Sequence, residues 1–250
     1  MYSLVYKQCK KSKEIVKQIR KIEHELFKLG YNEAGLSNKV LLNIDIAHSH
    51  FTMLIHNQGI LEGIHATYLQ TQTILDNGNV NGLRPDEITK IINLKNAWSF
   101  VLDKDVIKER QDFYLYQNIA KLVNTNLLTF PDKIRTTKVR IAGCNYEPPI
   151  PFEVDVKQEI KNIVNKKSSA IDIAINLCLY CMKRQIFNDG NKRSAVIFAN
   201  HFLISNGGGL IIIQERDVNK FKELLCNYYD RNEIKPITNF LKNKCWIKMK

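Results

Sequence analysis

The sequence has 250 residues, a formal net charge of +12 at neutral pH and 44% hydrophobic residues. A chain of this length can bury a core and is most simply one domain with an accessory helical part. No apolar run approaches the roughly 20 residues that span a bilayer, so a membrane-spanning class is excluded and we expect no membrane partner. The N-terminus lacks the apolar stretch of a secretory signal, and we therefore expect a cytoplasmic protein.

Residues 11–29 predict the first helix. Ile15, Ile19 and Ile22 recur at spacings of four and three, which places them on one helical face. We assign residues 1–50 to an N-terminal helical region.

Helical patterns continue as far as residue 128. Residues 38–59 form one apolar helical stretch, and residues 85–102 and 112–128 repeat their apolar positions with a period near 3.6. Pro85 suits the first turn of its helix.

Residues 133–151 depart from this pattern. Val139 and Ile141 alternate with charged residues, and a turn around Gly143 precedes Pro148. The alternation predicts a short β-hairpin flanked by loops.

The rest of the chain returns to helical patterns. Helices are predicted for residues 152–165, 168–184 and 192–207, and a short apolar run and two further helices follow. The sequence therefore predicts a mainly α-helical fold with one or two short hairpins.

We interpret the cysteines as reduced thiols, because a chain of this size needs no disulfide framework. Cys178 and Cys181 form a CxxC pair inside the apolar run AIDIAINLCLYCMKR, with no second pair at zinc spacing. This context favours core packing over metal binding. The six cysteines are Cys9, Cys144, Cys178, Cys181, Cys226 and Cys245.

The segment QIFNDGNKR, residues 185–193, lies between two predicted helices. Its backbone N–H groups can point at one anion, and Gly190 lets the backbone approach a phosphate closely. Lys192 and Arg193 add positive charge at the same helix N-terminus. Asp189 is the carboxylate of the loop and the candidate Mg²⁺ ligand. The alternative is a plain loop and N-cap, since Asn, Asp and Gly are also common turn residues.

This arrangement of helix, loop and helix resembles the Fic/Doc (Fido) family. The family motif HxFx(D/E)GN(G/K)R is matched at Phe187 and at each defined position from Asp189 to Arg193, while Gln185 stands where the family has its catalytic histidine. The resemblance implies that Phe187 anchors the loop in the core. Gln185 is then a degenerate form of the catalytic base.

Two further segments extend the resemblance. ILEGIHATYLQTQ, residues 60–72, is similar to the family's segment around an inhibitory Glu-Gly. TTKVRIAGCNYEPP, residues 136–149, is similar to the target-docking hairpin called the flap. We assign residues 51–245 to a Fic/Doc (Fido) domain.

The resemblance implies a Fic-type helical bundle with a short β-hairpin flap. It implies transfer of AMP, or of phosphate in Doc-like members, from ATP or another nucleoside triphosphate to a protein hydroxyl. Asp189 would hold Mg²⁺, and the phosphates would be cradled by Gly190, Asn191, Lys192 and Arg193. The implied partners are a nucleotide, a target protein with an exposed Ser, Thr or Tyr, and an antitoxin or inhibitor helix.

Two departures from the family pattern point toward the Doc-like branch. Lys192 stands where AMP-transferring members usually have a second glycine, and Val196 stands where many carry a second arginine. Glu62 matches the inhibitory Glu-Gly and is the candidate regulatory residue, although it lacks that arginine as a partner and Gln58 replaces the usual Ser or Thr. The alternative for Glu62 is an ordinary buried or capping carboxylate.

Gln185 cannot act as a general base near neutral pH, because its amide does not titrate as an imidazole does. It can still orient a hydroxyl and donate hydrogen bonds to a phosphate. Losing general acid–base help costs about 10²–10⁴-fold in rate. Phosphoryl transfer relies mainly on positioning and charge stabilisation, so we expect weakened or altered transfer.

Two other functions stay open. A catalytically silent nucleotide-binding or regulatory module follows from Gln185 alone. A helical nucleic-acid-binding protein follows from the charge, but it lacks a recognition motif, and nucleic acid is the least favoured partner. The histidines lie outside the loop and are interpreted as surface or core residues: His24, His48, His50, His56, His65 and His201.

Overall fold

The computed structural model describes residues 18, 21, 25 and 35–248. Most of the helix predicted for residues 11–29, including Ile15, Ile19 and Ile22, lies outside the described residues. Among the described residues, no helix is long and apolar enough to cross a membrane.

The described residues form ten α-helices and one two-stranded sheet. The helices are α2 (Asn38–Ser49), α3 (Phe51–Leu61), α4 (Tyr68–Leu75), α5 (Pro85–Leu102), α6 (Phe113–Asn124), α7 (Glu153–Val164), α8 (Ala170–Arg184), α9 (Asn191–Ser205), α10 (Val218–Arg231) and α11 (Ile234–Phe240). Short 3₁₀ turns span Val106–Lys108 and Glu215–Asp217, and a π-helical turn spans Leu241–Cys245. Strand β1 (Leu210–Ile211) pairs antiparallel with β2 (Trp246–Ile247).

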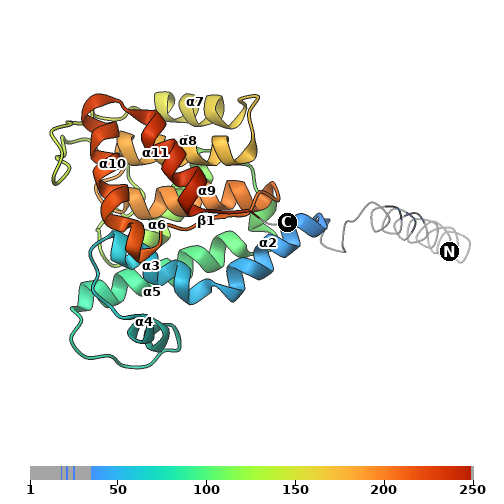
Figure 1. Cartoon of the computed structure of the whole chain (residues 1–250), viewed down its shortest axis with the longest axis horizontal. Helices are drawn as coiled ribbons and strands as arrows, with labels where there is room; N and C mark the ends of the chain where they lie inside the picture. The colour runs from blue at the N-terminus through green and yellow to red at the C-terminus, as the bar shows by residue number, and fades with distance from the viewer. Residues whose placement is uncertain (1–17, 19–20, 22–24, 26–34, 249–250) are drawn as a thin grey trace, which may run out of the picture.

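Helix α9 crosses the middle of the molecule (Figure 1), where it packs against α8 on one side and against α5 and α6 on the other. Every side chain from Arg193 to Ile204 is buried, which is typical of a central helix. Asn200 bonds both backbone groups of Ile211, at 3.0 Å to its oxygen and 2.8 Å from its nitrogen. Because α9 is enclosed on all sides, its N-terminus and the preceding loop are held in a fixed place.

Side-chain caps set the start of the helices around α9. At the start of α6, Asp112 accepts hydrogen bonds from the backbone N–H groups of Tyr114 and Leu115. Ser169 accepts from the N–H of Asp172 at the start of α8. Each cap satisfies donors that a first helical turn leaves unpaired. Both helices begin close to their predicted positions.

The predicted mainly helical fold class is confirmed, but the predicted hairpin in residues 133–151 is corrected. Within these residues the backbone forms a turn from Ile141 to Cys144 and no strand ladder. The guanidinium of Arg135 occupies carbonyls that a hairpin would need, those of Thr137 and the two prolines, and a proline has no N–H for a ladder. The two-stranded sheet forms instead between β1 and β2.

The interpretation of all cysteines as reduced thiols is wrong for one pair. Cys144 and Cys226 form a disulfide across a sequence separation of 82 residues. Such a pairing depends on how the fold brings two distant segments together, which spacing along the chain does not reveal. Cys178 and Cys181 are fully buried free thiols in α8, in agreement with core packing.

Candidate nucleotide-binding site

Gln185 ends α8 in a left-handed backbone conformation, with φ of 49°. Its carbonyl oxygen accepts a hydrogen bond from Arg135 Nε at 2.5 Å. Its side-chain Nε2 donates to the carbonyl of Met182 at 2.6 Å, and its Oε1 accepts from Asn191 Nδ2 at 3.2 Å. Both ends of the amide therefore have a partner, Met182 in α8 and Asn191 at the start of α9.

Phe187 holds the middle of the loop in the core. Its side chain is 1% exposed, and its ring lies 5.3 Å from the ring of Tyr116. The side chain of Asn191 closes the loop by accepting from the Phe187 N–H and donating to the Phe187 carbonyl. The side chain of Asn191 thus shapes the loop, and its backbone is left to face a ligand.

Gly190 is the N-cap of α9, with φ of 73°. A Cβ at this position would meet Asn124 Oδ1 at 2.5 Å and Val123 Cγ1 at 2.9 Å, so only glycine fits. Asn124 also donates to the carbonyl of Asp189 at 3.0 Å. No side chain caps α9, and the N–H groups of its first turn are therefore available to an anion.

Four charged side chains meet at this helix end. Arg193 is 1% exposed, and its guanidinium lies 2.9 Å from Asp189 Oδ2. Glu62, whose side chain is 14% exposed, lies 3.6 Å from Lys192 Nζ and 3.8 Å from Arg193 Nε. Neither Glu62 Oε1 nor Arg193 Nε has a hydrogen-bond partner, although both atoms are buried. The carboxylate of Glu62 thus lies beside the cations of Lys192 and Arg193 without forming a close hydrogen bond to either.

The loop forms one wall of a cavity of about 720 Å³. Binding pockets for small molecules typically measure about 300–1,000 Å³. The cavity walls include Glu62, Gln185, residues 188–192, flap residues 139–144, and a face of α10 with Lys222 and Tyr229. The predicted site residues Gln185, Asp189, Gly190, Asn191, Lys192 and Glu62 therefore share one cavity, whereas Phe187 and Arg193 support it from the core.

Sequence reasoning missed the residues that α10 contributes. Tyr229 is 3% exposed and lines the cavity, and its hydroxyl has no hydrogen-bond partner. Burial raises the pKa of Tyr229 well above its ordinary value, so the hydroxyl is neutral and can donate. Lys222 adds a cation to the same wall. No sequence motif identifies Tyr229 or Lys222 as a site residue, since α10 has the pattern of an ordinary amphipathic helix.

Comparisons with known proteins agree with this geometry. Residues 101–203 match the Fic/DOC family. These residues form a Fic/DOC domain. They include α6, α8, the loop and most of α9.

Relatives of the Fic/DOC domain extend the match beyond these residues. The chain is 23% identical over 199 residues to "Protein adenylyltransferase Fic" of Aedes aegypti, a stretch that covers 75% of this chain and 38% of that protein. The chain thus spans about two fifths of the length of this curated relative.

Two solved structures show the same fold. Fic-1 of C. elegans superposes with a TM-score of 0.65 at 19% identity, covering 92% of this chain and 71% of that one. A Fic domain containing signaling protein from Bacteroides thetaiotaomicron superposes with a TM-score of 0.66 at 16% identity, covering 90% of each chain.

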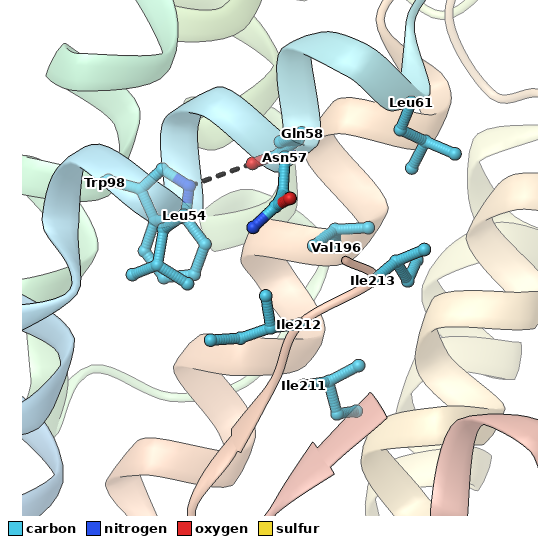
Figure 2. Close-up of a pocket in the computed structure, with 9 residues that line it drawn as sticks. All are labelled: Leu54, Asn57, Gln58, Leu61, Trp98, Val196, Ile211, Ile212 and Ile213. Atoms are coloured by element: carbon cyan, nitrogen blue, oxygen red, sulfur yellow. Dashed lines mark hydrogen bonds between the residues drawn. The ribbon is translucent and has the colours of Figure 1, made fainter. Parts of the chain in front are cut away.

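A separate feature of the chain is an apolar region around Val196 of α9. Figure 2 shows Val196 among Leu61 and Ile213 beside a small cavity of about 10 Å³. In the same view Trp98 Nε1 donates to Gln58 Oε1 at 2.9 Å. Gln58 Nε2 also donates to the Arg193 carbonyl at 2.7 Å. Gln58 of α3 therefore connects α5 and α9.

Magnesium fits the domain only together with a nucleotide. Asp189 is half exposed on the cavity wall, and its Oδ2 pairs with Arg193 while no hydrogen bond occupies Oδ1. Among the described residues, no group of three His, Cys, Asp or Glu side chains could hold a metal ion. One carboxylate together with phosphate oxygens and waters is a usual Mg²⁺ environment, so this donor set is compatible with Mg²⁺ on a nucleotide.

None of the histidines that the structure describes lines the cavity. His56 lies 3.5 Å from Glu215. His201 is buried, and its Nε2 lies 2.9 Å from the carbonyl of Val106. Loss of hydration lowers the pKa of His201 to about 4. His24 lies outside the described residues. A replacement for the motif histidine is therefore absent from the described walls of the cavity.

Proposed function

We propose that this chain binds a magnesium–nucleoside triphosphate and transfers AMP or phosphate from it to a hydroxyl of a target protein, at a weakened rate. The observation that carries the proposal is the uncapped N-terminus of α9, which opens with Gly190 and Lys192 into a cavity large enough for a nucleotide. The adenylyltransferase name of the Aedes aegypti relative supports the same reaction class.

Each group of the loop has a stated role in this proposal. The N–H groups of residues 190–192 and the ammonium of Lys192 bind phosphate oxygens. Asp189 holds Mg²⁺, which neutralises charge on the phosphates when bound. Arg193, which is buried and pairs with Asp189 and Glu62, supports the loop and adds positive charge behind the phosphates. Val196 removes the second arginine found in many AMP-transferring members, and we propose the Doc-like arrangement for this reason.

Gln185 limits the rate in this proposal. Its amide cannot accept the proton of an attacking hydroxyl, and neutral Tyr229 is too weak a base to replace it. The remaining catalysis comes from positioning and charge, which dominate phosphoryl transfer. We infer a slow transferase on these grounds.

Labelled nucleotides test the proposal. The chain is incubated with Mg²⁺, a cell extract, and ATP labelled at either the α- or the γ-phosphate. Protein labelled from α-phosphate indicates AMP transfer, and label from γ-phosphate alone indicates phosphate transfer. Absence of nucleotide binding by calorimetry would contradict the proposal as a whole.

A catalytically silent nucleotide-binding module is the second candidate. The observation that favours it is that hydrogen bonds with Met182 and Asn191 hold the Gln185 amide, which leaves a single N–H and one oxygen lone pair to orient a hydroxyl. Nucleotide binding without label on any protein would select this candidate over the slow transferase.

A further inference from the structure

The disulfide between Cys144 and Cys226 joins the two sides of the cavity. Cys144 belongs to the flap and Cys226 to α10, and their Cα atoms lie 5.5 Å apart. Both cysteines line the cavity together with Gln185 and Lys192. Neither cysteine is fully buried, so a small reductant can reach the bond. The disulfide is therefore part of the cavity rim.

The base of the flap is held without the disulfide. Arg135, 1% exposed, donates to the carbonyls of Thr137, Pro148 and Pro149 at 2.8, 3.1 and 2.6 Å. These three charge-assisted hydrogen bonds clamp the two ends of the flap together. The flap therefore begins and ends at one position, where Arg135 holds both of its ends.

A second attachment holds the returning half of the flap. The carboxylate of Asp230 in α10 accepts from the N–H groups of Asn145 and Tyr146, at 3.0 and 2.9 Å. The ring of Tyr146 also stacks on Tyr229, with centroids 6.1 Å apart. Residues 145–149 thus keep their position whether or not the disulfide is present.

Residues 138–144, the flap tip, depend on the disulfide. Besides the disulfide and the adjoining 3.2 Å contact of Cys226 Sγ with the Gly143 carbonyl oxygen, the tip has weak contacts. These are a turn closed by the Cys144 N–H on the carbonyl of Ile141, partial burial of Ile141 and Cys144, and an exposed ion pair of Arg140 with Glu147. An exposed ion pair contributes little to stability. The covalent bond to Cys226 is the strong attachment of the tip to α10.

We propose that Cys144 and Cys226 form a thiol–disulfide exchange site that controls the opening of the cavity. A dithiol attacks one sulfur of the bond, forms a mixed disulfide and then closes to a cyclic disulfide, releasing both cysteines as thiols. Two electrons and two protons pass from the dithiol to the protein. A disulfide oxidant such as oxidised glutathione reverses the exchange.

The two redox states differ in the position of the flap tip. In the oxidised chain the disulfide attaches the flap tip to α10, and the two form a continuous rim around the cavity entrance. In the reduced chain the tip moves about its fixed ends, which widens the entrance. The effect on transfer rests on the proposed function and on the resemblance of the flap to a target-docking hairpin. The exchange and the movement of the tip do not depend on it.

Proteolysis of the whole chain tests the proposal without a nucleotide. Arg140 is 91% exposed at its side chain and gives trypsin a site inside the tip, while exposed Lys104 after α5 gives an internal control. After reduction with dithiothreitol we expect cleavage at Arg140 to accelerate on the order of tenfold, because cleavage needs local opening, and cleavage at Lys104 to stay unchanged. Equal cleavage at Arg140 in both states would overturn the proposal.

Two further arms complete the test. The Cys144→Ser/Cys226→Ser variant should be cleaved at Arg140 as fast as the reduced chain, with or without dithiothreitol. Peptide mapping after iodoacetamide should find both cysteines blocked in the chain treated with oxidised glutathione and both alkylated after reduction. Alkylation of both cysteines after oxidation would also overturn the proposal. If the proteolysis and alkylation results agree with the proposal but the chain does not bind ATP, only the proposed function is contradicted.

Discussion

The carboxylate of Glu62 lies 3.8 Å from Arg193 Nε, at the end of α9 where the proposed nucleotide places its phosphates. Glu62 is mostly buried, and its Oε1 has no hydrogen-bond partner. A fixed negative charge in this place repels a polyphosphate and competes for its cations. We therefore propose that Glu62 acts as an internal inhibitor, with Lys192 and Arg193 as its partners in place of a second arginine.

Glu62→Gln should tighten nucleotide binding. The substitution keeps the shape of the side chain and removes the charge, and we expect the Kd for Mg-ATP to fall on the order of tenfold, equivalent to about 1.4 kcal/mol. Isothermal titration calorimetry measures this directly. Glu223→Gln is the matched control, because Glu223 lines the same cavity but pairs with Lys220. An equal change in both variants, or no change in either, would contradict a specific role for Glu62.

Gln185→His should raise transfer of label to protein by about 10²–10⁴-fold, the usual contribution of a general base. Histidine tolerates the left-handed backbone at this position better than most residues. Gln185→Ala serves as the control, since it also breaks the bond to Met182 but supplies no base. If the histidine variant binds nucleotide and labels no more protein than the alanine variant, the site has lost more than its base.

Gly190→Ala should destabilise the fold and abolish nucleotide binding. The backbone conformation costs about 1–2 kcal/mol for a residue with a Cβ, and the contact with Asn124 adds about 1–3 kcal/mol. Urea unfolding measures the free energy. Gly63→Ala is the matched control, with φ of 79° and nothing within 4 Å of the added Cβ. The cost at Gly190 should exceed the cost at Gly63, and equal costs would rule out the steric account.

Acid should destabilise the chain through His201. The folded pKa of about 4 lies below the ordinary value of 6.5, because burial disfavours the charged ring. Below pH 6.5 the unfolded chain binds a proton that the folded chain does not, so stability present above this pH is lost as the pH falls toward 4. Between pH 6.5 and 4.5 the loss is about 2–3 kcal/mol. Unfolding of His201→Gln by urea at both pH values should show a smaller loss, and an undiminished loss would assign the effect to other groups.

Local patterns were sufficient to predict most helices. Caps such as Asp112 and Ser169 and the repeat of apolar positions lie within a few residues of the elements they start, so short windows contain the information. The hairpin prediction failed because the residue that decides the conformation of the flap lies outside the alternating segment. The partner of the flap backbone is the buried guanidinium of Arg135, and the alternation of Val139 and Ile141 gives no sign of it.

The candidate site likewise combines residues that a local motif predicted with residues that are distant in the sequence. The loop motif is contiguous, and its residue types alone predicted a phosphate cradle, while the resemblance to the Fic/Doc motif pointed to Gln185 as the degenerate position. Tyr229 and Lys222 reach the cavity from α10, and Glu62 reaches it from the end of α3. The meeting of these side chains depends on how the helices pack around α9.

By itself the sequence determined that the chain is mainly helical and that residues 185–193 have the composition of an anion-binding loop between two helices. Those properties follow from residue type and short-range spacing. Only the tertiary structure decided that Cys144 pairs with Cys226 and that Glu62 faces Arg193, pairs separated by 82 and 131 residues. Contacts across such separations are set by the packing of a common core, which no local pattern encodes.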